Sequence, residues 1–145
     1  MYIGITNDHR GIKVKQFLTE YLTGLGYNAI DYGADSEEPA DFPDYAKKLG
    51  LGLLNGEITY GIAICGTGIG MSIAANKVKG IRCGHCSTKE QAHLTKEHNC
   101  ANVIALSYKQ DLNELAEMIK EFIETENSPE ERHNRRVNKI SDYEE

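Results

Sequence analysis

The sequence has no long hydrophobic run: no stretch of its 145 residues approaches the roughly 20 apolar residues that a membrane helix needs. Its first residues, MYIGITNDHRG, lack the basic segment and apolar run of a secretory signal, so we expect none. Basic residues are in deficit, because 16 Lys and Arg stand against 22 Asp and Glu and give a formal net charge of −6. That charge disfavours nucleic acid, whose binding depends on a basic face. We therefore expect neither a membrane nor a nucleic acid as partner.

Cysteine is too sparse, and placed wrongly, for a disulfide-stabilised protein. Cysteines lie within expected strands, which suits a reducing compartment, and we expect the protein in the cytoplasm. Internal repeats, linkers and low-complexity segments are also missing. Since 40% of the residues are apolar, the chain is long enough to bury one core, and a single domain is predicted over residues 1–145.

Short apolar segments alternate with helical patterns along the chain. Five runs rich in β-branched residues are typical of buried strands: Tyr2–Thr6, Asn28–Tyr32, Tyr60–Cys65, Ile81–Cys86 and Asn102–Leu106. Apolar residues at helical spacing occur over residues 14–25, which precede a left-handed cap at Gly26. The same spacing occurs after Pro43 and again over residues 112–123. This alternation predicts an α/β fold, a three-layer α/β/α sandwich around a five-stranded, mainly parallel, Rossmann-like sheet.

Polar loops follow three of these strands, at the edge where open α/β sheets bind ligands. They are NDHRG (7–11), CGTGIG (65–70) and STKEQ (87–91). In the last loop, Thr88 and Gln91 have the spacing of a capping box, which favours a structural role.

Three glycines at alternate positions follow Cys65. Their spacing fits neither the dinucleotide-binding fingerprint nor a Walker loop, which leaves a strand, a bend and a helix over residues 69–76. The free amides of that helix start predict an anion hole, whereas the alternative is a turn in which glycine only supplies positive φ. A helix N-terminus also favours a thiolate over a thiol, so Cys65 is a candidate base or nucleophile rather than a small core residue.

Two other groupings do not predict a metal site. Cys83 and Cys86 have C-x-x-C spacing, but residues i and i+3 of a strand point to opposite faces, which excludes a shared zinc ion or a disulfide. His93 and His98 are five residues apart and do not share one helix face. Taken alone, His98 has the position of a helix C-cap partner.

The C-terminal segment SPEERHNRRVNK is basic. Ser128, Pro129 and Glu131 predict a capping box at the start of a final helix. Arg132 and Arg136 then share one helix face, which suits a single phosphate better than DNA, although a solvated basic helix end is the alternative.

Five segments together resemble one known family. They are NDHRG (7–11), DFPDYA (41–46), GIAICGTGIGMSIAANKVKGIR (61–82), EHNCANV (97–103) and RHNRR (132–136). In these segments, which extend over nearly the whole chain, the sequence resembles the ribose-5-phosphate isomerase B family, which also contains galactose-6-phosphate and allose-6-phosphate isomerases.

The resemblance implies an aldose–ketose isomerase that interconverts ribose 5-phosphate and ribulose 5-phosphate through an enediolate, without a metal or organic cofactor. An allose- or galactose-6-phosphate isomerase subunit and a non-catalytic sugar-phosphate-binding module remain alternatives. Active sites of the family are usually built at a dimer interface, which implies a homodimer or homotetramer with shared sites. The basic helix over about residues 128–140 is then expected to complete the site.

The resemblance also assigns roles by position. Cys65 matches the base, Thr67 lies beside it in the loop, and His98 matches the residue that opens the sugar ring. Substrate-binding roles fall on Asp8, His9, Gly66, Gly68, Ile69, Gly70, Asn99, Lys109, Arg132 and Arg136. Among these, the loop amides are expected to hold the enediolate oxygen, Asp8 and Asn99 the sugar hydroxyls, and His9 with the two arginines the phosphate.

The sequence departs from the family pattern at two positions. Lys109 in LSYK stands where many relatives have an arginine, so the charge is kept and the planar fork is lost. Arg10 in DHRG replaces the commoner alanine and is hypothesised to change the preference for sugar length.

Overall fold

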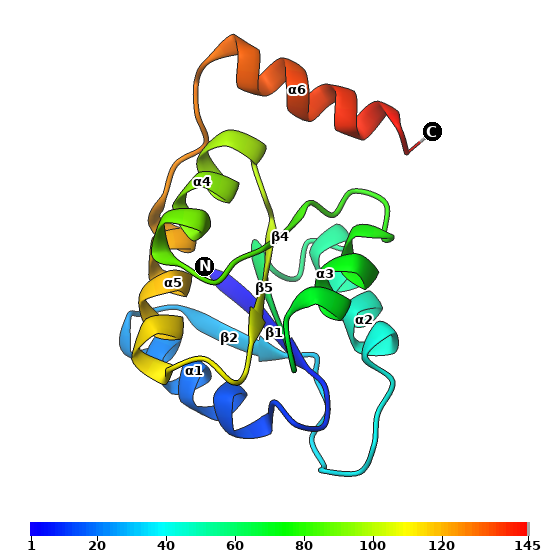
Figure 1. The fold of residues 1–145 in the computed structure, drawn as a ribbon, viewed down its shortest axis with the longest axis vertical. Helices are drawn as coiled ribbons and strands as arrows, with labels where there is room; N and C mark the ends of the chain where they lie inside the picture. Colours follow the sequence, from blue (N-terminus) through cyan, green and yellow to red (C-terminus); the bar gives the residue numbers. More distant parts are fainter. Residues whose placement is uncertain (145) are drawn as a thin grey trace.

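Five strands form one sheet in the computed structural model, which describes residues 1–144 (Figure 1). The strands are β1 (Tyr2–Asn7), β2 (Asn28–Asp31), β3 (Tyr60–Cys65), β4 (Cys83–His85) and β5 (Val103–Ser107). Their order is β2-β1-β3-β5-β4, and every neighbouring pair is parallel. The predicted α/β class and five-stranded sheet are confirmed, and the sheet is wholly rather than mainly parallel.

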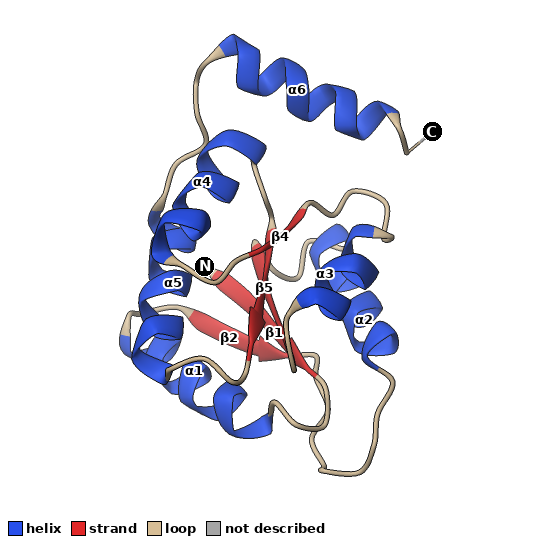
Figure 2. Ribbon diagram, viewed as in Figure 1, coloured by secondary structure: helices blue, strands red, loops and turns tan. Residues whose placement is uncertain are grey.

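Helices cover both faces of the sheet (Figure 2). They are α1 (Ile12–Gly24), α2 (Phe42–Leu54), α3 (Ile69–Asn76), α4 (Lys89–Asn99), α5 (Leu112–Glu124) and α6 (Glu131–Asp142). Helices α1, α4 and α5 pack on one face, α2 and α3 on the other, and α6 extends past the sheet and packs on α4. Within residues 1–144, no helix is long and apolar enough to cross a membrane.

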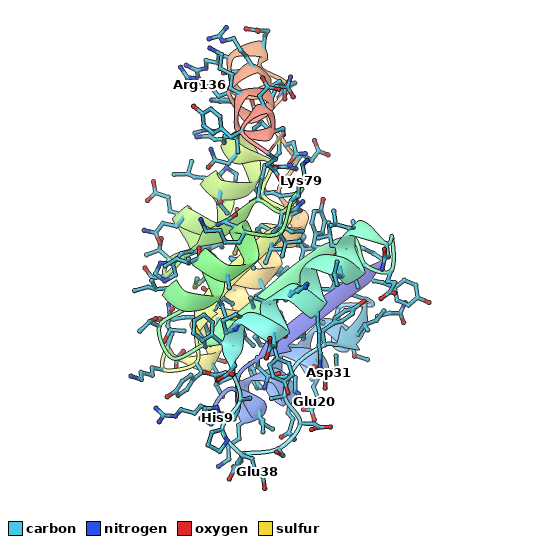
Figure 3. All side chains as sticks on the ribbon, turned by 90° about the vertical axis from the view of Figure 1, so that its right-hand side faces the viewer. His9, Glu20, Asp31, Glu38, Lys79 and Arg136 are labelled. Carbon is cyan, nitrogen blue, oxygen red and sulfur yellow. The ribbon has the colours of Figure 1, made fainter. Side chains whose placement is uncertain are left out.

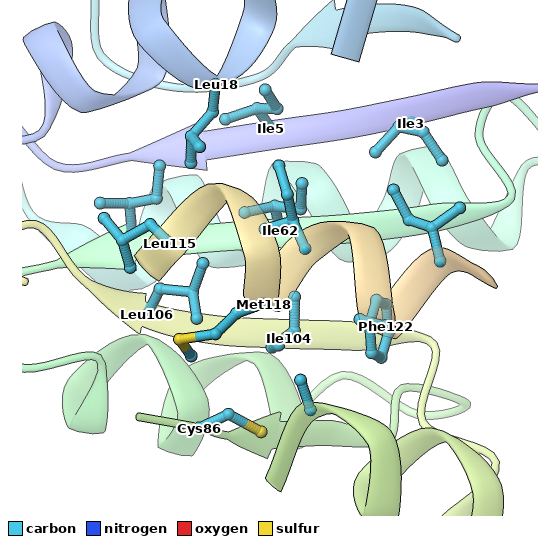
Figure 4. Packing of buried hydrophobic residues seen from close by; sticks show 14 of the residues in the cluster. Ile3, Ile5, Leu18, Ile62, Cys86, Ile104, Leu106, Leu115, Met118 and Phe122 are labelled. Carbon is cyan, nitrogen blue, oxygen red and sulfur yellow. The ribbon is translucent and has the colours of Figure 1, made fainter. Parts of the chain in front are cut away.

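The three central strands, β1, β3 and β5, are buried on both faces, which explains their nearly continuous apolar sequences. Alternate residues of β3 belong to different core clusters: Ile62 and Ile64 pack towards α1 and α5, while Ala63 and Cys65 pack towards α2 and α3. Figure 4 shows the first cluster, in which Ile62 and Phe122 are fully buried. The period of two along β3 therefore places the Cys65 thiol on the side of the sheet from which α3 begins.

The fourth strand is shorter than the sequence predicts. The predicted segment Ile81–Cys86 forms a strand only over Cys83–His85, and it is an edge strand paired with β5 alone. The N–H of Arg82 donates to the Asn102 side-chain oxygen at 2.8 Å instead of joining a ladder. Cys83 and Cys86 pack into opposite core clusters, as predicted.

The final helix begins later than predicted. α6 starts at Glu131, and Ser128 is not its N-cap, because its hydroxyl accepts from the N–H of Glu130 at 3.1 Å and bonds the His133 ring at 2.7 Å. The predicted capping box at this helix is therefore wrong.

The other predicted helix boundaries agree with the structure. α3 spans the predicted residues 69–76, and α1 ends before Gly26, whose φ is +92°. At α4, the Thr88 hydroxyl accepts from the Gln91 N–H at 3.1 Å, but the Gln91 side-chain oxygen accepts from the N–H of Ser87 rather than of Thr88.

Candidate active site

The turn between β3 and α3 has its carbonyl groups fixed by neighbouring strands. The N–H of Tyr108 donates to the Cys65 carbonyl at 3.0 Å, and the Ser107 hydroxyl donates to the Gly66 carbonyl at 2.7 Å. In a planar trans peptide, the C=O and the following N–H point in opposite directions. Fixing these carbonyls therefore fixes the direction of the next N–H groups in the turn.

The following peptide, between Thr67 and Gly68, is held in the same way. Its carbonyl oxygen lies 2.9 Å from His85 Nε2 at the end of β4, and its N–H donates to the Cys65 sulfur at 3.2 Å. Gly68 has φ +81°, which a residue with a side chain adopts only under strain. The predicted positive φ is thus real, and the same turn directs an amide at the thiol.

The N-terminus of α3 has free donors. The Thr67 hydroxyl accepts from the Ile69 N–H at 3.1 Å, and the Ser72 N–H donates to the Gly68 carbonyl. The N–H of Gly70 lies in the first turn, where no intrahelical acceptor exists. Such a helix start can bind an anion or a developing negative charge.

Cys65 differs chemically from the cysteines near it. Cys65 is 6% exposed, and burial by itself favours the thiol. Its sulfur accepts an amide hydrogen bond and lies beside a helix N-terminus, two features that favour a thiolate. Burial raises the pKa of Cys83 to about 12 and that of Cys86 to about 11. Cys83 and Cys86 therefore stay protonated near neutral pH, and Cys65 is the candidate nucleophile or base.

The loop after β1 brings two more predicted residues to this edge. The Asp8 N–H donates to the Ile64 carbonyl at 3.2 Å, and the Asp8 carboxylate accepts from the Arg10 N–H at 3.0 Å. His9 Nδ1 accepts from the Ala40 N–H at 3.1 Å, so in the neutral ring Nε2 carries the proton. His9 thus keeps a donor for a ligand.

One edge of the sheet therefore unites most of the predicted site. Lys109 follows β5, where its N–H donates to the Ser107 hydroxyl at 3.1 Å. We call this group the strand-end half-site; its residues are Asp8, His9, Cys65, Gly66, Thr67, Gly68, Ile69, Gly70 and Lys109. They follow β1, β3 and β5, which are neighbours in the sheet. This is the edge where open α/β sheets bind ligands.

The remaining predicted residues lie elsewhere in the chain. His98 and Asn99 end α4, whose 11 residues rise about 16 Å away from the carboxyl edge of the sheet. Arg132 and Arg136 lie on α6, and Figure 3 shows His9 and Arg136 at opposite ends of the molecule. We call His98, Asn99, Arg132 and Arg136 the helix-end half-site. One chain alone does not bring the two half-sites together.

The helix-end half-site is organised around two stacked histidines. The rings of His98 and His133 are parallel to within 28°, with centroids 4.3 Å apart, and Ser128 anchors His133. They line an open cleft of about 650 Å³. Arg132 Nε donates to Glu130 at 2.6 Å, and this hydrogen bond lowers the pKa of Glu130. The other two guanidinium nitrogens of Arg132 remain available to an anion.

Some contributing residues are not predicted from the sequence. His85 is expected inside a strand and instead ends one, and the sequence does not indicate that Ser107 donates to the glycine turn. Nor does it indicate that His133, in the basic segment, is buried against His98. The polar character of His85 at the carboxyl end of a strand in the same sheet is the signal that identifies it. Among the described residues, no group of three or more His, Cys, Asp or Glu is arranged to hold a metal ion.

Comparison with known proteins gives a consistent result. The model of the family described as Ribose/Galactose Isomerase matches residues 3–140. Ribose-5-phosphate isomerase B of Escherichia coli is 44% identical over 112 residues, which cover 77% of this chain and 75% of that protein.

Solved structures agree over the full length. Ribose-5-phosphate isomerase B of Clostridium thermocellum has a TM-score of 0.95 and 39% identity, covering 99% of this chain and 97% of the other. Type B ribose 5-phosphate isomerase of Trypanosoma brucei has a TM-score of 0.95 and 38% identity, covering 99% and 98%. The resemblance seen in the sequence is therefore confirmed, and the chain belongs to the Ribose/Galactose Isomerase family.

Proposed function

We propose that the protein is an aldose–ketose isomerase that interconverts ribose 5-phosphate and ribulose 5-phosphate. The observation that carries the proposal is the Cys65 thiol, which lies 3.2 Å from the Gly68 amide in a turn of fixed peptides. The relatives named ribose-5-phosphate isomerase B, which align over most or all of the chain, support the choice of substrate.

Cys65 acts as the base. Its thiolate takes the proton from C2 of the open-chain aldose, negative charge develops on O1, and the resulting thiol returns a proton to C1. The proton on O2 moves to O1, which leaves the carbonyl at C2 and completes the ketose. A preorganised amide aimed at the developing charge is worth about 3 kcal/mol per donor in known cases.

Thr67 assists the transfer between the two oxygens. Because its hydroxyl oxygen accepts the Ile69 N–H, the hydroxyl hydrogen remains available to the substrate. Asp8 holds a sugar hydroxyl beside it, and the Nε2–H of His9 binds the phosphate together with Lys109. These contacts position the substrate, which converts binding energy into rate.

A second copy of the chain completes the site. His98, which opens the sugar ring, and Asn99, which binds a hydroxyl, are too far from Cys65 in one chain to touch the same pentose. In a homodimer, or in a tetramer built from it, the partner's His98 and Asn99 reach the sugar, while the partner's Arg132 and Arg136 bind its phosphate. The basic helix thus completes a site in the neighbouring subunit.

An apolar surface beside the strand-end half-site supports this assembly. Ile69 and Ile73 on α3 are 50% and 59% exposed, and a groove of about 580 Å³ between α2 and α3 is lined by Phe42 and Leu51. Exposed apolar patches of this kind mark interaction sites. We place the subunit contact over α3.

The proposal includes a cytoplasmic location. All four cysteines are free thiols, which fits a reducing compartment.

The test is ketose formation by purified protein in the presence of a chelator, with ribose 5-phosphate, allose 6-phosphate and galactose 6-phosphate as substrates. We expect turnover of ribose 5-phosphate that is lost in Cys65→Ala while substrate binding persists. Turnover of only a six-carbon substrate would favour the hexose phosphate isomerases, and binding without turnover of any substrate would favour a non-catalytic module.

Arg10 is the residue to vary for substrate length. Its side chain is exposed next to Asp8 and His9, which are proposed to bind the sugar and the phosphate. Arg10→Ala is expected to change the ratio of kcat/KM between five- and six-carbon substrates. An unchanged ratio would refute this role.

A further inference from the structure

One peptide unit next to the thiol is hydrogen-bonded at both of its ends. The carbonyl of Thr67 lies 2.9 Å from His85 Nε2, and the N–H of the same peptide, which belongs to Gly68, donates to the Cys65 sulfur at 3.2 Å. Since the peptide is planar, its orientation cannot change at one end without changing at the other. The histidine and the thiol are therefore coupled through a single rigid group.

The direction of the histidine bond follows from its partner. A backbone carbonyl only accepts hydrogen bonds, so His85 Nε2 must donate, and the ring carries its proton there when neutral. A donor on the carbonyl polarises the peptide and makes its N–H a better donor to a thiolate.

Packing around the ring is tight on one side and open on the other. His85 is exposed, yet a Cβ on Gly68 would meet His85 Cδ2 at 2.9 Å. The ring edge therefore lies directly against the turn. An exposed histidine contributes little to the core, and within residues 1–144 the hydrogen bond to the Thr67 carbonyl is the one that its ring makes.

We propose that His85 is a positioning residue for the isomerase reaction: it holds the Thr67–Gly68 peptide so that the Gly68 N–H stabilises the Cys65 thiolate. The catalytic consequence rests on the proposed function, in which Cys65 is the base. The effect on the thiol itself does not, because it is measured without turnover.

Other titratable groups surround the thiol and remain constant in the comparison. On β4, the Cys83 thiol is close enough for its charge to interact with that of Cys65. Asp8 and His9 follow β1, and Tyr108 and Lys109 follow β5, on the two strands that flank β3. Because none of these groups is altered, a difference in the Cys65 midpoint between His85 variants is caused by the Thr67–Gly68 peptide and not by these charges.

The experiment compares three substitutions that separate the hydrogen bond from ring packing. His85→Gln keeps an N–H donor at the same number of bonds from the backbone, His85→Phe keeps a ring without a donor, and His85→Ala keeps neither. His93→Ala, in the middle of α4 where the ring bonds Glu97 and Glu121, is the control for loss of a partly exposed histidine in the alkylation assay.

The readout is the pH dependence of Cys65 alkylation by iodoacetamide, followed by mass spectrometry of the peptide that contains it. We expect the wild type, His85→Gln and the control to share one midpoint. In His85→Phe and His85→Ala, the midpoint rises by about 0.5–1 pH unit, which lowers the alkylation rate at neutral pH by about 3- to 10-fold. In the same two variants, the acidic limb of the pH profile of kcat/KM also moves to higher pH.

Two results would overturn the proposal. One is a common midpoint for all variants, and the other is a wild-type midpoint in His85→Phe with a raised one in His85→Gln, which would mean that the ring acts by packing. If the wild type alkylates as expected but does not isomerise any sugar phosphate, the proposed function fails, and only the effect of His85 on the Cys65 thiol stands.

Discussion

The proposed division of the site between two chains predicts that two inactive variants restore each other's activity. Cys65→Ala removes the proposed base from the strand-end half-site, and His98→Asn removes the proposed ring-opening group from the helix-end half-site. About 16 Å of helix separates His98 from the carboxyl edge within one chain, so the proposal takes the two residues of each site from different subunits. Each variant alone is expected to have little activity.

The magnitude follows from the symmetry of a dimer. Random exchange places half of all dimers in the mixed form, in which one site has both intact residues and the other has neither. About one quarter of all sites are then intact, and the mixture should reach about one quarter of wild-type activity.

The assay is the initial rate of ribulose 5-phosphate formation after the two variants are unfolded and refolded together. The control is the same mixture without unfolding, together with each variant refolded alone. Mixtures no more active than the sum of the refolded single variants would refute the shared site.

Three further changes test the turn, the core and the sheet edge. Gly68→Ala places a Cβ 2.9 Å from His85 at φ +81°, and should lower kcat/KM about tenfold or more and stability by about 1 kcal/mol. Gly24→Ala, at the end of α1 with open space around it, should leave kcat/KM unchanged and should not lower stability. Lys96→Met should lower the urea unfolding free energy by about 1–2 kcal/mol, because a helix-end carbonyl of α5 that accepts from Nζ at 3.0 Å loses its donor; unchanged stability would contradict this. Burial and then a neighbouring carboxylate raise the pKa of Tyr32 from 10.0 to about 12, so the folded state favours the neutral phenol. The contribution of this pKa shift to the free energy of unfolding is fully present below pH 10 and is lost as the pH rises towards 12. The free energy of unfolding should therefore fall less between these pH values in Tyr32→Phe than in the wild type.

Local sequence signals predicted the elements that depend on near neighbours. The glycine turn and the helix over residues 69–76 followed from spacing alone, because positive φ at Gly68 and the free amides are properties of that segment. The opposite faces of Cys83 and Cys86 followed from the period of two in a strand.

Features that depend on distant partners were not predictable in the same way. The hydroxyl of Ser128 had the sequence position of a cap, but a ring five residues ahead competes for it. His85 bonds a turn that lies 18 residues earlier, and the separation of His98 from Cys65 depends on the direction in which α4 leaves the sheet. Tertiary contacts of this kind override local patterns.

The most direct test of the account follows the hydrogen on C2 of the substrate. Ribose 5-phosphate is converted in D₂O, and the ribulose 5-phosphate formed early in the reaction is analysed for deuterium at C1. Proton transfer by the Cys65 thiol, which exchanges with solvent, predicts deuterium at C1. Complete retention of the original hydrogen would indicate a direct shift from C2 to C1 and would contradict the role of the thiolate as base.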